Sequence, residues 1–290
     1  MILPVELADV IELWVWGSGS SMTISQLEAH IETGVPEESI DYSDDDAGEP
    51  FEVLAQQVFD EFLERQQRIG TSYPFACDGY KVRYFKNQDP PNPYIFCLLL
   101  SYLPATHVHN DQRATQFETL AMNAAENFFG GEALRIGWPW ERPTYNDLLA
   151  DVIGLLPNLG QINLPAPVVA GDRGWDILVV KGFQDGHYPK LIALGNCATG
   201  RMDWKRKGME VQPEHFWECF QHQRPGTWLT FSAVPFRMDS DSRSRKGAKS
   251  NLTLDRYRIC EFANSISADA EIWVNGQRHN AVDVPMDSSI

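Results

Sequence analysis

Several common signals are missing from this sequence of 290 residues. The longest apolar run, Tyr94 to Leu103, is about half as long as a membrane-spanning helix requires. The N-terminus lacks a basic region followed by an apolar stretch and a small-residue cleavage site, so we expect no secretory signal. The five cysteines stand singly, without a metal-type pair, which favours reduced thiols in a cytoplasmic protein over a disulfide framework.

Motifs of several enzyme classes are also absent. The sequence has no Walker loop and no Rossmann glycine fingerprint, so ATP-driven and nicotinamide-dependent chemistry have no support. The Gly-x-Ser-x-Gly elbow of serine-type α/β hydrolases is missing as well. These absences exclude no fold, but they leave the function to be inferred from other residues.

Basic residues are scarce, with 24 Lys and Arg against 40 Asp and Glu and a net charge of −16. Such a balance argues against general nucleic-acid binding, which depends on cations that contact phosphates. However, residues 171–260 hold 15 basic and 10 acidic residues, so the acidity is concentrated elsewhere. The acidic N-terminal half either docks a basic partner or serves solubility.

Periodic apolar residues predict an α/β (α+β) fold with a mixed sheet flanked by helices and a mainly helical N-terminal region. We expect an acidic α/β region over residues 1–112 and a second domain over 113–290. The expected helices are 5–16, 51–68, 117–128, one capped by Thr144 with Asp147 as its partner, one beginning at Pro213 and a last one beginning at Asp255. The expected strands are 80–85, 177–180, an apolar run within 191–200, 228–234 and 271–274, with 94–103 as either a buried strand or the start of a helix.

Two neighbouring strands at residues 171–200 organise the chain. Asp172 and Asp176 stand around the start of the strand from Ile177 to Val180. The turn signal Asp185-Gly186 follows, and then the strand that leads to Asn196, so the two strands are expected to pair antiparallel. Asp176 would then lie beside Asn196, where its carboxylate could hold a divalent cation.

This pattern resembles the PD-(D/E)XK, or restriction-endonuclease-like, nucleases, and among them the Mrr-like branch. These proteins have a Gly-Asp-x-Gly-x-Asp turn into a strand, a hairpin, and a strand that ends in Glu/Gln-x-Lys. The resemblance covers about residues 115–235 and implies a restriction-endonuclease-like core in the second domain. Asp176 matches the metal-binding aspartate, whereas Asn196 and Ala198 replace the expected Glu or Gln and the expected Lys.

The resemblance also suggests further site residues. A glutamate from the helix before the core often joins the metal site in this superfamily, and Glu118 takes that position here, with a solvated helix glutamate as the alternative. Asp176, Glu118 and Asp172 are the expected ligands of Mg²⁺ or Mn²⁺, and Asn196 is a weaker neutral ligand. Lys205 or Lys207 is the expected catalytic cation in place of Ala198.

A basic cluster follows the second strand of the hairpin. Arg201 and Arg206 flank Trp204, and this combination is suited to bind a phosphate backbone and stack a base. A solvated start of a helix is the alternative interpretation of the same residues.

The leading functional hypothesis is a metal-dependent nuclease that acts on nucleic acid, with DNA expected. The resemblance implies a role in bacterial anti-phage defence or restriction, with a motor or sensor protein as a partner that could dock on the acidic N-terminal half. The first alternative is a catalytically silent nuclease-like module that binds nucleic acid or a protein, as the substitutions Asn196 and Ala198 would suggest. A second alternative is a structural interaction protein that uses the acidic N-terminal half.

Overall fold

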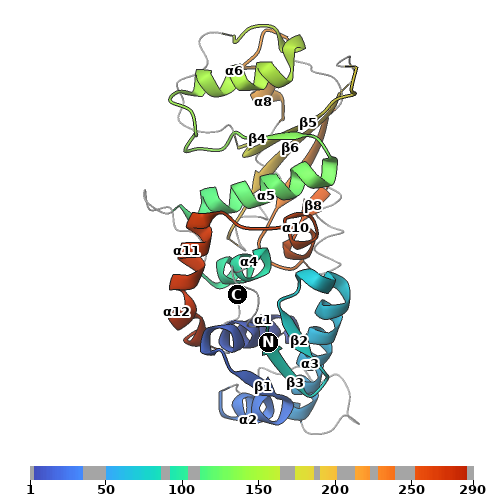
Figure 1. The fold of residues 1–290 in the computed structure, drawn as a ribbon, viewed down its shortest axis with the longest axis vertical. Helices are drawn as coiled ribbons and strands as arrows, with labels where there is room; N and C mark the ends of the chain where they lie inside the picture. The colour runs from blue at the N-terminus through green and yellow to red at the C-terminus, as the bar shows by residue number, and fades with distance from the viewer. Residues whose placement is uncertain are drawn as a thin grey trace. The chain divides into compact units, whose positions relative to one another are not determined.

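The computed structural model describes residues 3–34, 50–85, 92–103, 112–163, 174–185, 190–200, 213–222, 228–238 and 252–285. The chain divides into two compact units. The first contains residues 1–103 together with 268–290, and the second contains residues 104–267 (Figure 1). The predicted domain boundary between residues 112 and 113 stays a prediction, because compactness alone does not establish independent folding.

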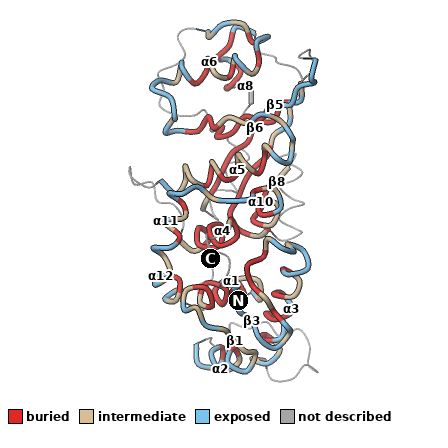
Figure 2. The backbone as a smooth tube through the Cα atoms, viewed as in Figure 1, coloured by how far each residue is buried: buried red, intermediate tan, exposed pale blue. Residues whose placement is uncertain are grey.

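The first unit is mainly helical. The longest helix, α3 (Pro50–Ile69), packs against α1 (Pro4–Ser18) and α2 (Ile24–Gly34). Apolar residues on α1 and almost the whole of α4 are buried, as Figure 2 shows in red. The other elements of this unit are η2 (Gly70–Ser72), α4 (Pro93–Tyr102), α11 (Ala268–Gly276), α12 (Arg278–Val282) and the strands β1 (Ser21–Thr23), β2 (Phe75–Cys77) and β3 (Lys81–Tyr84).

The three strands of the first unit form a small antiparallel sheet in the order β1-β3-β2. Val82 pairs with Met22 on one side and with Cys77 on the other, so β3 is the central strand. Residues along β3 alternate between exposed and buried, which places Val82 and Tyr84 toward the core and Lys81 and Arg83 toward solvent.

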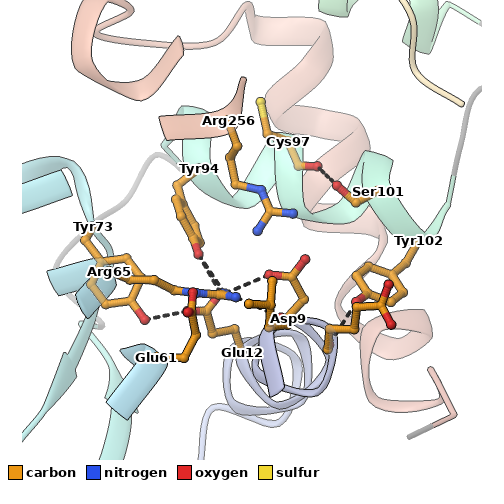
Figure 3. A network of polar contacts seen from close by, with 12 residues as sticks. Asp9, Glu12, Glu61, Arg65, Tyr73, Tyr94, Cys97, Ser101, Tyr102 and Arg256 are labelled. Carbon is orange, nitrogen blue, oxygen red and sulfur yellow. Dashed lines mark hydrogen bonds and ion pairs between the residues drawn. The ribbon is translucent and has the colours of Figure 1, made fainter. Parts of the chain in front are cut away.

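A buried polar network lies in the core of the first unit (Figure 3). The guanidinium of Arg65 donates to Asp9 at 2.7 Å, to Glu12 at 2.8 Å and to Glu61 at 2.7 Å. Tyr94 donates to Glu12 at 2.7 Å, and Tyr73 donates to the other oxygen of this carboxyl. Arg65 thus joins α3 to α1 through charge-assisted hydrogen bonds in a region without solvent access.

The second unit is built on a five-stranded mixed sheet in the order β4-β5-β6-β7-β8. The first three strands pair antiparallel, whereas β7 is parallel to β6 and β8 is parallel to β7. The elements are α5 (Arg113–Phe129), β4 (Glu132–Arg135), α6 (Tyr145–Leu155), η3 (Pro157–Leu159), β5 (Ile177–Lys181), β6 (Leu191–Cys197), α8 (Pro213–Trp217), β7 (Trp228–Ala233), β8 (Leu252–Leu254) and α10 (Arg256–Phe262).

Helices cover the two faces of this sheet. Leu178 and Val180 of β5, with Ile192 and Leu194 of β6, share an apolar cluster with Leu149 and the other buried residues of α6, and with α8. Helix α5 contacts β4, β5 and β6 and packs against α10. Figure 1 shows the sheet between α6 and α8 on one side and α5 on the other. The predicted α/β class with a helix-flanked mixed sheet is therefore confirmed.

Local predictions have mixed outcomes. The capping box of Thr144 and Asp147 is present, and Gly130 ends α5 with a φ of 61°. For residues 94–103, the alternative of a helix is correct, because residues 94–102 lie within the buried helix α4. The predicted strand at 271–274 is wrong, because these residues lie within α11. The helix that starts after Asp255 is not the last one, since α11 and α12 follow it. Among the described residues, no helix is long and apolar enough to cross a membrane.

Candidate active site

Asp176 is fixed at the point where three strands of the second unit meet. Its amide donates to the carbonyl of Gly195 at the end of β6, at 2.9 Å. Its own carbonyl accepts hydrogen bonds from the amides of Ile136 and Gly137, at 2.8 and 3.1 Å, just beyond β4. The side chain is held too, because Oδ2 accepts a hydrogen bond from the amide of Cys197 at 2.6 Å. These contacts set the direction of a carboxylate that is only 4% exposed.

Glu118 comes to the same place from α5. It follows Phe117 in a helix whose apolar stripe packs on the sheet, and its side chain is 7% exposed. A buried carboxylate requires hydrogen bonds or a paired cation, because loss of hydration would otherwise oppose its charge. The cation here is Arg135, whose Nη1 lies 2.7 Å from Glu118 Oε2. The alternative of a solvated helix glutamate is therefore wrong.

Gly137 marks the point where the two carboxylates converge. A methyl group on this residue would lie 2.7 Å from Glu118 Oε2 and 3.0 Å from Asp176 Oδ1. Both separations are shorter than a normal contact of a Cβ atom, so a side chain at this position would displace the carboxylates. Glycine thus provides the space in which one oxygen of each acid faces the same point.

Arg135 is the cation of this site within the described residues. Besides Glu118, it contacts Glu141 Oε1 through Nε at 3.0 Å and the carbonyl of Gly137 through Nη1 at 3.1 Å, and its Nη2 donates to the carbonyl of Pro139. Burial alone would lower the pKa of Arg135, but its hydrogen bonds and charge interactions with Glu118 and Glu141 outweigh burial and raise this pKa. The guanidinium therefore stays protonated.

Of the two positions that depart from the resembled motif, Asn196 lies beside Asp176 and Ala198 lies further along the chain. Gly195 pairs with Ile177, so Asn196 and Cys197 continue β6 past the start of β5, as predicted. Asn196 is 3% exposed and pairs with Ser232 of β7. Ala198 lies in an apolar cluster with Val234, Phe236 and Met238. The position at which the resembled motif has its lysine therefore carries a small side chain in apolar surroundings.

The structure brings together two of the predicted metal ligands, Asp176 and Glu118, with Asn196 nearby in β6. The other predicted residues lie outside the described ranges; they are Asp172, Arg201, Trp204, Lys205, Arg206 and Lys207. In the described part of the chain, no group of three or more His, Cys, Asp or Glu side chains is arranged to hold a metal ion. Within the described residues, the candidate metal ligands are therefore the carboxylates of Asp176 and Glu118.

Sequence reasoning did not find Arg135 and Gly137. The available signal was a single arginine between Ala133-Leu134 and Ile136, which is unusual unless the charge is paired in the interior. A glycine directly after an apolar strand and before Trp138-Pro139 was a second signal, since such a glycine often marks a close approach of other groups.

Comparisons of the chain with models of protein families, with curated proteins and with solved structures find no match.

Two acidic side chains that converge in a site almost closed to solvent can bind a hard divalent cation through oxygen ligands. The absence of a Cβ on Gly137 leaves room at that point, so the residues present fit such an ion. The guanidinium of Arg135 supplies a permanent positive charge on the Glu118 side of the pair.

Proposed function

We propose that the second unit is a metal-dependent nuclease. The observation that carries this proposal is the convergence of Glu118 Oε2 and Asp176 Oδ1 on the position of the missing Cβ of Gly137. Glu118 comes from helix α5, and Asp176 directly precedes strand β5, 58 positions later. The resembled nucleases use a glutamate from a helix and an aspartate at a strand in these roles. A pair of strands forms an antiparallel hairpin directly after Asp176, in agreement with the resemblance.

Two carboxylates are sufficient for the proposed cation. Mg²⁺ is commonly held by one or two carboxylates, with water and substrate phosphates as its remaining ligands. When bound, such an ion stabilises charge on a phosphate and lowers the pKa of an attacking water. Asn196 would add only a neutral ligand, so we expect weak binding of Mg²⁺ without substrate.

The chain's own groups would orient and neutralise the reacting phosphate. The hydrogen bond from the Cys197 amide to Asp176 Oδ2 turns Oδ1 toward Gly137. Arg135 contacts both Glu118 Oε2 and the carbonyl of Gly137, and it would oppose the negative charge that develops on the phosphate. Lys205 and Lys207, which follow β6 in the sequence, remain the candidates for the catalytic cation in place of Ala198. A DNA substrate, an anti-phage role and a partner on the acidic half remain predictions from the resemblance and the charge.

The proposal is tested by cleavage of plasmid and single-stranded DNA with Mg²⁺ or Mn²⁺. Wild type is compared with Asp176→Asn, Glu118→Gln and Glu141→Gln, and Mn²⁺ binding is measured by calorimetry on each protein. Glu141 is the matched control, because it contacts the same Arg135 but is 60% exposed and does not face Gly137. We expect Asp176→Asn and Glu118→Gln to lose both cleavage and Mn²⁺ binding, while Glu141→Gln keeps both. Cleavage that survives Asp176→Asn would refute the assignment.

The alternative function is a silent nuclease-like module that binds nucleic acid or a protein. Two observations favour it: Ala198 lies in an apolar cluster, and Arg135 already neutralises Glu118. A metal-free protein that binds DNA in a gel shift, with no Mn²⁺ binding and no cleavage, would support this function over the nuclease.

A further inference from the structure

A solvent-filled groove lies in the first unit, distant in sequence from the acids of the second. Its volume is about 720 Å³, and it runs between the turn after α3 and the exposed face of β2 and β3. Gly70 and Thr71 line one side, and Ala76 of β2 lines the sheet side. Every residue that lines this groove belongs to the first unit.

Two side chains of β3 and one from the residue that follows it give this groove its chemistry. Lys81, Arg83 and Phe85 occupy alternate positions, so they project from the same face of the sheet. Lys81 and Arg83 are exposed, and Phe85 keeps 42% of its surface in contact with solvent. Ala76 pairs with Arg83 in the register of β2 and β3, and its short side chain leaves the arginine accessible from the groove. Two cations on β3 and an aromatic ring directly after it thus follow one another along the chain.

An acidic residue also lines the groove at its turn. Asp78 Oδ1 accepts hydrogen bonds from the amides of Tyr80 and Lys81, at 3.0 and 2.9 Å, and these bonds lower the pKa of Asp78. Burial raises the pKa of the Cys77 thiol, which also lines the groove, so the thiol stays uncharged. The ionised side chains in the lining are then two cations and one anion, and the groove carries a positive balance in a chain whose net charge is −16.

We infer that this groove binds a nucleoside phosphate, with the phosphate on Lys81 and Arg83 and the base stacked on Phe85. Cations that track phosphates beside an exposed aromatic ring are the combination by which proteins hold single-stranded nucleic acid. The volume is within the range of sites for ligands of this size. A free nucleotide and a nucleotide within a strand present the same chemistry. This inference goes beyond the proposed nuclease, since it assigns a binding site to another unit and requires no cleavage.

The test uses the full chain with EDTA, so that cleavage and metal binding do not contribute. Binding of a fluorescein-labelled ten-residue oligothymidylate is measured by anisotropy at several salt concentrations. The unlabelled oligothymidylate, thymidine monophosphate and inorganic phosphate serve as competitors. The variants are Lys81→Gln combined with Arg83→Gln, and Phe85→Ala. The control is Arg142→Gln, which removes an exposed arginine of the second unit whose ion pair with Asp151 lies at the surface.

We expect the double variant to weaken binding at least about tenfold and to reduce the salt dependence, since fewer phosphates are contacted. Phe85→Ala should weaken binding at least about fivefold through loss of stacking. The control should bind like wild type, and all variants should keep the thermal midpoint of wild type within a few degrees because the replaced side chains face solvent.

Competition separates the two sources of the ligand. Displacement by thymidine monophosphate at concentrations comparable to the oligonucleotide indicates a free-nucleotide site, whereas displacement only by oligonucleotide indicates a strand. Both results support the inference. It is overturned if wild type does not bind the probe, if folded groove variants bind it as tightly as the control, or if inorganic phosphate competes as well as the nucleotide and Phe85→Ala has no effect.

Discussion

Glu118 Oε2 takes part in both features of the candidate active site. Arg135 Nη1 contacts this oxygen at 2.7 Å, and it is also the Glu118 oxygen nearest to the position of a Cβ on Gly137. The carboxylate oxygen that would bind a cation already contacts a guanidinium. A bound metal ion and Arg135 would therefore share the charge of one acid. In the absence of metal, Arg135 stabilises the buried carboxylate, and this stabilisation would lower the apparent affinity for the proposed cation.

Replacement of Arg135 should reveal this competition. We expect Arg135→Gln to lower the free energy of unfolding by about 3 kcal/mol or more, because a buried charge loses its partner. Added Mn²⁺ should raise the stability of the variant more than that of wild type, since the ion would take the place of the guanidinium. Urea unfolding with and without Mn²⁺ measures both effects. Arg142→Gln, which breaks an exposed ion pair, is the control and should change stability by less than about 1 kcal/mol. Equal stabilisation of variant and wild type by Mn²⁺ would contradict a shared site.

Gly137→Ala should disrupt the site by a steric clash, without a change of charge. The added methyl group would come within 3.0 Å of an oxygen of each acid, so the carboxylates must separate. We expect a loss of about 1 to 3 kcal/mol in stability from overpacking, together with loss of Mn²⁺ binding. Gly154→Ala is a matched control, because a methyl group on this residue of α6 meets no atom within 4 Å. Chemical unfolding and calorimetry on the two variants check the prediction, and normal Mn²⁺ affinity in Gly137→Ala would count against the site.

Much of this architecture was accessible from periodicity. The apolar stripe of α5 placed Glu118 beside the buried face, and the turn signal at Asp185-Gly186 predicted the antiparallel pairing that brings Asp176 next to the end of β6. These features depend on local spacing, which a sequence displays directly. The convergence of Glu118 and Asp176 was predictable only through the resemblance, because their contact joins segments far apart in the chain.

Other features depend on tertiary packing that no local pattern reveals. The short strand β4 was not predicted, and with it Arg135 was missed, because four residues after two glycines carry little periodicity. Residues 271–274 have the β-branched and aromatic character of a strand, yet Ala270 and Val274 are buried in a helix that packs against α4. There the contact of Trp273 with Phe96 outweighs local strand propensity.

Glu12 should make the stability of the protein depend on pH. Burial is the largest influence on this acid and raises its pKa from 4.5 to about 7. The folded protein thus holds a proton that the unfolded chain releases, so this contribution to stability is complete below about pH 4.5 and is lost as the pH rises to about 7. Glu12→Gln, which resembles the protonated acid, should remove this contribution. Urea unfolding from pH 4.5 to 8 should show that the stability of wild type relative to Glu12→Gln falls across this window and is constant above it. A constant difference throughout would contradict the raised pKa.

The approach of Gly195 to Phe231 gives a further prediction about the sheet beneath the site. A methyl group on Gly195 would lie 2.2 Å from Cζ of Phe231, on the strand that pairs with β6 in parallel. Gly195→Ala should therefore lower the free energy of unfolding by about 1 to 3 kcal/mol, because the ring cannot retreat within a packed core. The carbonyl of Gly195 accepts the amide of Asp176, so displacement of β6 should also weaken Mn²⁺ binding.

A double-mutant cycle separates this steric clash from a general effect on the strand. Phe231→Leu replaces the phenyl ring with a shorter side chain and should create space for the methyl group of Gly195→Ala. We expect the cost of Gly195→Ala to be smaller in the Phe231→Leu background than in wild type, with a coupling of at least about 0.5 kcal/mol, as is found for residues in direct contact. If the two substitutions were simply additive in urea unfolding, the clash with Phe231 would not be the reason for glycine at this position. Recovery of Mn²⁺ affinity in the double variant would link the packing of β6 and β7 to the placement of Asp176.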